Sequence, residues 1–331
     1  MQKIINEPAD VVGEALRGMA AAHPDLVRIT TDPVAVVRAD APVSGEVAVI
    51  SGGGSGHEPL HGGFVGPGML TAAVPGSVFT SPTPDAVQAA VAEADGGAGA
   101  LLLVKNYTGD VLNFETAAEL ANAEGRDVRS VVIDDDVAVR DSTNTAGRRG
   151  VAGTVLVEKL VGAAARAGAS LDECEALARR LVAGVRSMGV ALSAPTVPHA
   201  GEPSFELADG EMELGIGIHG EPGRERLPLE PADGIVGRLL DAILDDQPLG
   251  SGQRVLLLTN SMGGTPPIEQ YLAHGVAERQ LVQRDLRVER RLVGAYTTSL
   301  EMRGVSLTVL PLDDELVGLW DAPVRTAALH W

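Results

Sequence analysis

The chain of 331 residues is long enough for about two domains of ordinary size. Its 45% hydrophobic and 3% aromatic residues predict a globular core built from Val, Leu, Ile and Ala. The formal net charge of −19 argues against nucleic acid and anionic membrane surfaces as partners, because both are bound by clustered Lys and Arg.

Short apolar runs alternate with helical patterns along the chain. Continuous apolar runs bounded by Gly, Asp or Asn are typical of strands that are buried on both faces. A helix is predicted from Ser170, because Ser170 and Glu173 form a capping box ahead of an apolar stripe. The alternation predicts an α/β fold with mostly parallel or mixed sheets. Strands are expected at 47–50, 101–104, 131–133, 255–258 and 305–310, and other helices at 85–94, 115–124, 153–167 and 234–245.

A boundary between two α/β domains is expected between about residues 189 and 203. Three prolines lie between residues 189 and 203, directly after a predicted helix, which suits a crossing between domains. We therefore expect an N-terminal domain over 1–188, which carries a glycine-rich loop, and a C-terminal domain over 189–331. In open α/β sheets ligands bind beyond the carboxyl ends of strands, so the site is sought there.

The cellular compartment is indicated by weak signals only. Cys174 is the only cysteine, which excludes an internal disulfide and a cysteine-rich metal site. The N-terminal segment lacks the apolar core of a signal peptide, and no apolar run approaches the ~20 residues of a membrane-spanning helix. A cytoplasmic protein is expected.

The segment 51–59, SGGGSGHEP, follows the apolar run 47–50 and resembles two nucleotide motifs incompletely. A P-loop requires Lys and then Ser or Thr where this chain has His57 and Glu58. The dinucleotide fingerprint fails as well, because His57 occupies the position of its third glycine. A nucleotide is therefore not expected at this segment.

Three other interpretations of the same segment stay open. Ser55 lies in a near match to the GxSxG hydrolase elbow, with His57 in place of the last glycine. Residues 57–61 match HExxH, but a zinc site requires this motif on a helix, which Pro59 and the flanking glycines disfavour. A simple turn that needs glycine is the plainest interpretation, although it leaves the imidazole unexplained.

Polar side chains also follow other predicted strands. Lys105 and Asp110 come after the run 101–104, and His219 comes after the apolar run 212–218 in a turn that echoes residues 56–59. A histidine can act as a base or a nucleophile, a carboxylate can take a proton, and backbone N–H groups can bind substrate oxygens. This set suits a small hydroxylated substrate.

The chain resembles the K subunit of dihydroxyacetone kinases over essentially its whole length. The resemblance implies one K unit over about residues 7–331. Eight segments carry it, in order: SGGGSGHEP, SPTPD (81–85), KNYTGD, NFETA (113–117), IDDDVAV (133–139), AGRRGVAGTVLVEK (146–159), GIHGEPG (217–223) and the ending LWDAPVRTAALHW.

The resemblance implies a protein that binds dihydroxyacetone while a separate L subunit holds the nucleotide, ADP or ATP with Mg. In many bacteria an M protein of the phosphotransferase system recharges that nucleotide. The resemblance further implies a homodimer, and no cofactor or metal is expected on this chain.

The roles of individual residues are carried over from the same resemblance. His219 is the nucleophile that adds to the ketone carbonyl and gives a covalent hemiaminal, which glycerol cannot form because it lacks a carbonyl. Asp110 takes the proton of the terminal hydroxyl, and His57 assists as a base or a hydrogen-bond partner. The residues expected to bind the substrate are Gly54, Ser55, Gly56, His57, Lys105 and Asp110.

Alternatives from other classes are kept beside this interpretation. A related ketose such as erythrulose carries the same carbonyl beside a hydroxymethyl group and could use the same histidine. A K-like protein could also sense a ketose and regulate transcription without catalysis. A serine hydrolase built on Ser55 and His57 is the weakest alternative.

Overall fold

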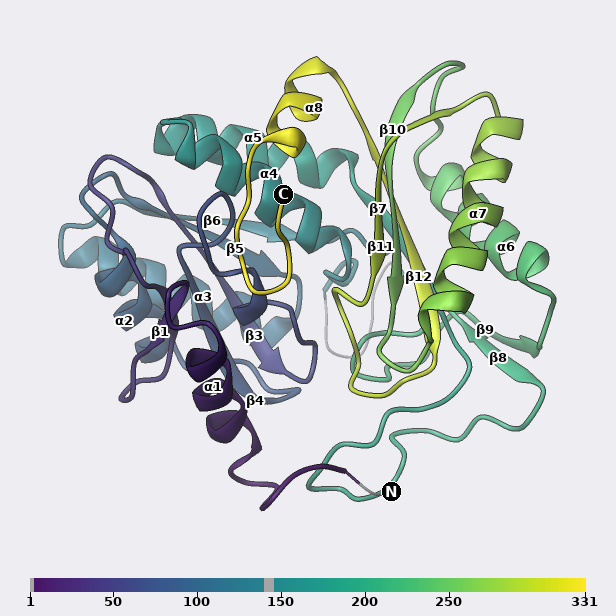
Figure 1. Ribbon diagram of the computed structural model, residues 1–331, viewed down its shortest axis with the longest axis horizontal. Coiled ribbons are helices and arrows are strands. Elements are labelled where there is room, and N and C mark those ends of the chain that lie inside the picture. The colour runs from purple at the N-terminus through teal and green to yellow at the C-terminus, as the bar shows by residue number, and fades with distance from the viewer. Residues whose placement is uncertain (1–2, 140–145) are drawn as a thin grey trace. The chain divides into compact units, whose positions relative to one another are not determined.

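A computed structural model gives the structure of the chain and describes residues 3–139 and 146–331 (Figure 1). The chain divides into two compact units that do not follow one another along the sequence. The first unit comprises Gln2–Ile133, Thr154–Arg180 and Gly318–Trp331, and the second comprises Asp134–Gly153 and Leu181–Val317. A domain boundary between residues 188 and 189 stays a prediction; both residues lie in one strand of the second unit.

The first unit is built on a six-stranded mixed sheet. The four strands β4, β3, β5 and β6 run parallel, and β1 and β2 extend the sheet antiparallel at one edge. In sheet order the strands are β1 (Val27–Ile29), β2 (Val36–Arg38), β4 (Ala72–Val78), β3 (Ala48–Ser55), β5 (Ala100–Lys105) and β6 (Val128–Ile133). Its helices are α1 (Val11–Ala22), α2 (Pro84–Ala94), α3 (Thr108–Ala123), most of α4 (Gly153–Arg166) and the greater part of α5 (Leu171–Gly184), with a short 3-10 turn at Gly62–Phe64.

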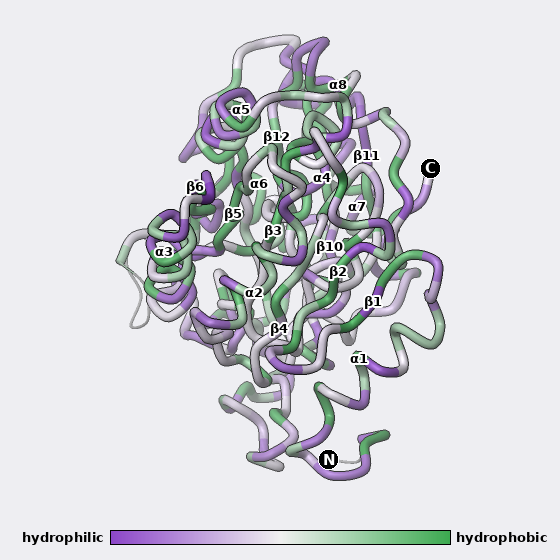
Figure 2. Tube along the Cα trace, turned by 90° about the vertical axis from the view of Figure 1, so that its left-hand side faces the viewer, coloured by the Kyte–Doolittle hydropathy of each residue, from purple (hydrophilic) through white to green (hydrophobic). Residues whose placement is uncertain are grey.

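The two faces of this first sheet carry different side chains because residues alternate along a strand. Ile50, Leu102 and Val104 pack against Val87 of α2 and Phe114 of α3 in one hydrophobic core. Figure 2 shows the hydrophobic trace of β5 in green. Side chains of the alternate positions on β3 and β5 point to the opposite face.

The second unit is built on another six-stranded mixed sheet, in which only β10 and β11 are parallel. Helices α6 (Ala232–Asp246) and α7 (Pro267–Gln283) pack with this sheet in one core, which includes Val236, Leu257 and Ala277. In sheet order the strands are β11 (Arg287–Gly294), β10 (Arg254–Ser261), β12 (Gly304–Pro311), β7 (Arg186–Ala191), β8 (Glu211–Leu214) and β9 (Glu225–Pro228). Helix α8 (Asp314–Asp321) begins in this unit and ends in the first.

The predicted α/β class with mixed sheets is confirmed, and all five predicted strands are present. The helix predicted from Ser170 is α5, and both capping bonds are made: the Glu173 N–H donates to Ser170 Oγ at 3.3 Å, and the Ser170 N–H to Glu173 Oε2 at 2.8 Å. Among the residues described, no helix combines the length and apolarity needed to cross a membrane.

Candidate active site

The glycine-rich segment forms the end of a buried strand, because β3 continues through Ser55. A Cβ atom on Gly52 would lie 2.5 Å from the Val74 oxygen, and one on Gly54 would lie 2.6 Å from the Thr80 nitrogen. A Cβ atom on Gly53 would lie 2.3 Å from Lys105 Nζ. These glycines therefore allow close approach of neighbouring groups, and the turn expected for residues 51–59 begins only after the strand, at Gly56.

His57 follows this strand in a fully buried position. Its ring stacks on the ring of Phe79, with centroids 5.0 Å apart and planes inclined by 14°. Phe79 has φ 56°, which is unusual for a bulky residue, and its N–H donates to the Ser55 oxygen at 2.9 Å. The backbone after β4 thus carries an aromatic platform for His57.

Lys105 and Asp110 meet at the carboxyl end of β5. Lys105 is the last residue of β5 and is completely buried, and Asp110 lies in the first turn of α3. Their Nζ and Oδ2 atoms are 3.8 Å apart. Asp110 Oδ1 is buried and has no hydrogen-bond partner among the described residues, so it is free to accept a bond from a ligand. Burial lowers the pKa of Lys105, against the opposing charges of Asp110 and Glu158.

The hydroxyl of Ser55 is engaged with the backbone. Its Oγ donates to the Gly76 oxygen at 2.7 Å, and a hydroxyl has only one hydrogen to donate. A hydrolase would transfer the Ser55 hydroxyl proton to His57, but this proton is donated to the Gly76 oxygen instead. This bond argues against Ser55 as a nucleophile that His57 activates.

The HExxH match does not form the helix that a zinc site requires, since residues 57–61 lie in a bend and turns. Both ring nitrogens of His61 contact protein groups: Nδ1 lies 2.6 Å from Glu158 Oε1, and Nε2 lies 3.1 Å from Lys105 Nζ. No group of three or more potential metal ligands occurs in the described part of the chain. The zinc interpretation therefore fails, because residues 57–61 do not form the helix that it requires.

His219 lies in a turn of the second unit, after β8. Its Nδ1 is 2.8 Å from Glu221 Oε1, and its backbone N–H donates to Glu221 Oε2 at 2.9 Å. Because Nδ1–H donates a hydrogen bond to this carboxylate, the lone pair of the uncharged imidazole form lies on Nε2. Burial opposes ionisation of Glu221, but the hydrogen bond from His219 and the charges of His219 and Arg149 lower its pKa to about 2.

The turn that holds His219 is supported by a buried arginine. Arg149 donates from Nε to Asp136 Oδ2 at 2.8 Å and from Nη2 to the Gly215 oxygen at 2.7 Å. A Cβ atom on Gly217 would lie 1.9 Å from Glu221 Oε2 and 2.6 Å from Arg149 Nη1. Glycine at 217 therefore lets the carboxylate and the guanidinium approach the turn.

The structure explains why two similar turns occur in one chain. In each, a glutamate before a proline accepts a backbone N–H from two residues earlier: Gly56 donates to Glu58 Oε2 at 2.9 Å, as His219 does to Glu221. The glutamates thus fix the backbone of both turns. Burial raises the pKa of Glu58, against two backbone hydrogen bonds that lower it.

Six of the seven predicted site residues lie in the first unit, and His219 lies in the second. Within the first unit, Gly54, Ser55, Gly56 and His57 follow one another at the end of β3, and Lys105 and Asp110 flank the end of the adjacent β5. Sequence reasoning gave no place in the proposed ketose chemistry to the residues that support this set directly or through one neighbour: Phe79, His61, Glu158, Glu221 and Arg149. The HExxH match could have pointed to His61, and the glutamate shared by the two similar turns could have pointed to Glu221.

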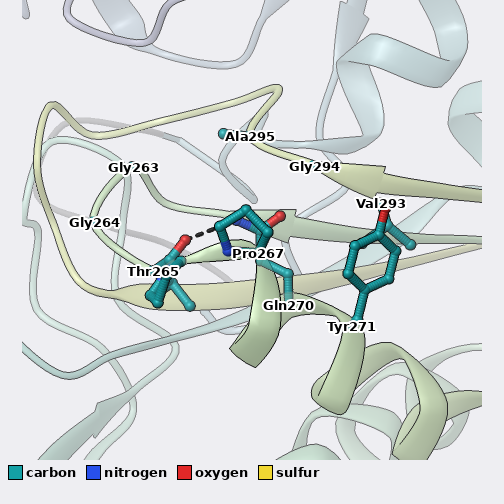
Figure 3. Close-up of a pocket in the computed structure, with 10 residues that line it drawn as sticks. Gly263, Gly264, Thr265, Pro267, Gln270, Tyr271, Val293, Gly294 and Ala295 are labelled. Atoms are coloured by element: carbon teal, nitrogen blue, oxygen red, sulfur yellow. Dashed lines mark hydrogen bonds between the residues drawn. The ribbon is translucent and has the colours of Figure 1, made fainter.

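A separate pocket of about 460 Å³ in the second unit contains none of these residues (Figure 3). Its wall includes Gly263, Gly264, Pro267, Tyr271 and Val293, and the Gln270 amide donates to the Thr265 oxygen at 2.7 Å. This wall offers no carboxylate, imidazole or amine for catalysis.

Comparison with known proteins gives consistent matches over nearly the whole chain. The Dak1 domain family matches residues 17–328. The dihydroxyacetone-binding subunit of the PEP-dependent dihydroxyacetone kinase of Escherichia coli is 53% identical over 355 residues, which cover 100% of this chain and 99% of that protein.

Two solved structures are similar in fold and sequence. The dihydroxyacetone kinase of C. freundii has a TM-score of 0.88 and 37% identity, over 98% of this chain and 60% of that one. A co-activator of a dihydroxyacetone kinase operon has a TM-score of 0.89 and 35% identity, over 98% of both chains.

Proposed function

We propose that this chain is the dihydroxyacetone-binding subunit of a dihydroxyacetone (glycerone) kinase. The chain belongs to the Dak1 domain family. The observation that carries the proposal is the arrangement of His219 on Glu221, which leaves Nε2 as the nucleophilic atom. The relatives name the substrate, and this histidine supplies the chemistry that a ketone requires.

His219 binds the ketone covalently. The Nε2 lone pair forms a bond to the carbonyl carbon, the carbon–oxygen π bond breaks, and the oxygen takes a proton from solvent to become a hydroxyl. The ring then carries a positive charge, which the Glu221 carboxylate at 2.8 Å from Nδ1 stabilises. Glycerol offers similar hydroxyls but no carbonyl, so it is rejected by reactivity, which separates the two more sharply than shape alone.

The first unit activates the terminal hydroxyl. Asp110 accepts the hydroxyl proton as the phosphoryl group arrives, and its Oδ1 is the buried atom available for that bond. Lys105 and the backbone of Gly54–Gly56 hold the substrate oxygens, and His57 assists as a base or a hydrogen-bond partner. Phosphoryl transfer depends mainly on such positioning and charge, so a covalent tether lowers its entropic cost.

The phosphoryl donor is assigned to a second protein. An L-type subunit with ADP or ATP and Mg supplies the phosphoryl group, either directly from ATP or through an M-type phosphotransferase protein. We assign the chain to the cytoplasm and to a homodimer, in keeping with such kinases.

The covalent adduct is the first test of this function. We expect intact-mass analysis after chemical trapping to detect one dihydroxyacetone adduct on the wild-type chain and none on His219→Ala. Glycerol serves as the matched ligand and should give no adduct. An unchanged adduct on His219→Ala would remove His219 from the mechanism.

A second candidate function is supported by the similarity to an operon co-activator. A ketose sensor would form the His219 adduct but would give no phosphorylated product with any L-type subunit and donor.

The identity of the ketose is a separate question, and dihydroxyacetone and erythrulose should be compared in the same assay. A higher kcat/KM for erythrulose would assign the kinase to that ketose.

A further inference from the structure

His61 is a buried histidine that the proposed chemistry does not use. It is the second histidine of the HExxH match, and its side chain is 3% exposed between Lys105 and Glu158, which are each 0% exposed. The three side chains come from different elements: His61 follows the end of β3, Lys105 ends β5, and Glu158 lies in α4. All three belong to the first unit.

The direction of the hydrogen bonds follows from Ser51. Its Oγ donates its only hydrogen to the Leu103 oxygen at 2.7 Å, so toward His61 Nδ1, 3.0 Å away, it can only accept. The proton of His61 therefore lies on Nδ1, where Glu158 Oε1 at 2.6 Å is a second acceptor. The lone pair on Nε2 is then left to accept from the Lys105 amine at 3.1 Å.

The charges in this group favour a neutral imidazole. Burial, with the charges of Lys105 and His57, holds the pKa of His61 well below its usual value. Burial raises the pKa of Glu158 to about 8, against the opposing charge of Lys105. A neutral ring with its proton on Nδ1 accepts from the amine through Nε2.

The position of the amine matters because Asp110 also lies near it. Lys105 Nζ is 3.8 Å from Asp110 Oδ2, which is longer than a hydrogen bond, and 3.1 Å from His61 Nε2. Without an acceptor at His61, the buried amine would have Asp110 as its nearest acidic partner and would move toward it. A close ion pair would occupy the carboxylate that takes the substrate proton.

We propose that His61 and Glu158 are positioning residues for Lys105. Glu158 orients the His61 ring and fixes its tautomer, and His61 holds the amine away from Asp110 with its remaining N–H groups directed at the substrate. This inference rests on the proposed function only in assigning Lys105 and Asp110 to the substrate.

The first test is independent of catalysis. Nitrogen-15 NMR of the wild-type chain should show His61 as a neutral ring protonated at Nδ1, and Glu158→Leu should change the tautomer or the Nδ1 signal. A ring protonated at Nε2, or an imidazolium at pH 7, would overturn the inference even if the kinase assignment holds.

The second test uses turnover with an L-type subunit. We expect His61→Leu to lower kcat by about 10- to 100-fold while the His219 adduct still forms at saturating ketose, because the amine is misplaced by about 1 Å or more. His61→Gln keeps an acceptor toward Lys105 and should recover most of that loss. Exposed His199 provides the matched control, His199→Leu.

These outcomes separate the two hypotheses. Absence of an adduct on the wild-type chain defeats the proposed function, whereas a kcat for His61→Leu equal to wild type defeats the positioning role. Equal losses in His61→Leu and His61→Gln, with both variants folded by circular dichroism, would also defeat it. If His61→Leu does not fold, the comparison of His61→Gln with Glu158→Leu and the NMR tautomer decide the question.

Discussion

Asp110 is the residue whose chemistry is simplest to isolate, because its Oδ1 has no protein partner among the described residues. An asparagine has nearly the same shape but cannot take up the hydroxyl proton. We expect Asp110→Asn to keep the ketose adduct and to lose about 10²–10⁴-fold in phosphorylation rate. Intact mass and a coupled kinase assay measure the two effects, and a wild-type rate would remove Asp110 as the base.

Glu158 provides a prediction on stability. Its folded pKa of about 8 lies above the usual carboxyl value of 4.5, so its contribution to stability is greatest below pH 4.5 and declines as pH rises to 8. Glu158→Gln keeps an acceptor for the His61 Nδ1 proton without the ionisation. We expect the variant to gain stability relative to wild type, by a few kcal/mol in total, as pH rises from 5 to 8.

The check on this prediction is urea unfolding of both proteins at several pH values. The other buried groups, Lys105, His61 and Asp110, are present in both chains, so the difference between the two unfolding free energies isolates residue 158. A difference that does not vary with pH would show that Glu158 does not titrate in this range.

At the scale of elements, β3 depends on glycine for its contact with β5. The Cβ atom of Gly53→Ala would lie 2.3 Å from Lys105 Nζ, and Gly53 has φ 154°. We expect this variant to lose about 1–3 kcal/mol of stability and most of its turnover, since the amine must move. Thermal unfolding and the kinase assay measure the two losses.

Gly18→Ala provides the matched control for the same chemical change. Gly18 lies in α1 with no atom within 4 Å of its Cβ position, and Ala is the better helix former. Its stability should equal or exceed that of wild type. A Gly53→Ala protein as stable and active as this control would contradict the role given to the glycine.

The elements that sequence analysis predicted are those with a local signal. The apolar runs of β3, β5 and β10 and the Ser170 capping box are readable from neighbouring residues alone. Helix α7 gave no such signal, because it exposes apolar side chains such as Ile268 and Leu272 as well as burying others.

The candidate site, like the fold, was predicted where neighbouring residues carry a signal and was missed where the contact is distant in sequence. The side chains at strand ends were found, because strand ends are visible in the sequence. The pair His61 and Glu158 was not found, since the two residues are 97 positions apart and meet only through tertiary packing. The close contact of Gly53 with Lys105 depends in the same way on strand order in the sheet.

At the scale of the whole molecule, the proposed division of labour predicts a requirement for a partner. The purified chain with dihydroxyacetone and Mg-ATP should give no dihydroxyacetone phosphate, and addition of an L-type subunit with its donor should restore product. The chain is expected to supply substrate binding and the base, whereas the partner supplies the phosphoryl group. Product formation by the highly purified chain alone would contradict this division.

The last residues of the chain complete the first unit. The Arg325 N–H donates to the Pro67 oxygen at 3.0 Å, and the Ala328 N–H to the Gly63 oxygen at 3.0 Å. During synthesis on the ribosome, the segment after the glycine-rich strand therefore completes its packing only when about 260 further residues have been made. A nascent chain that stalls before residue 318 would expose this surface to chaperones and proteases.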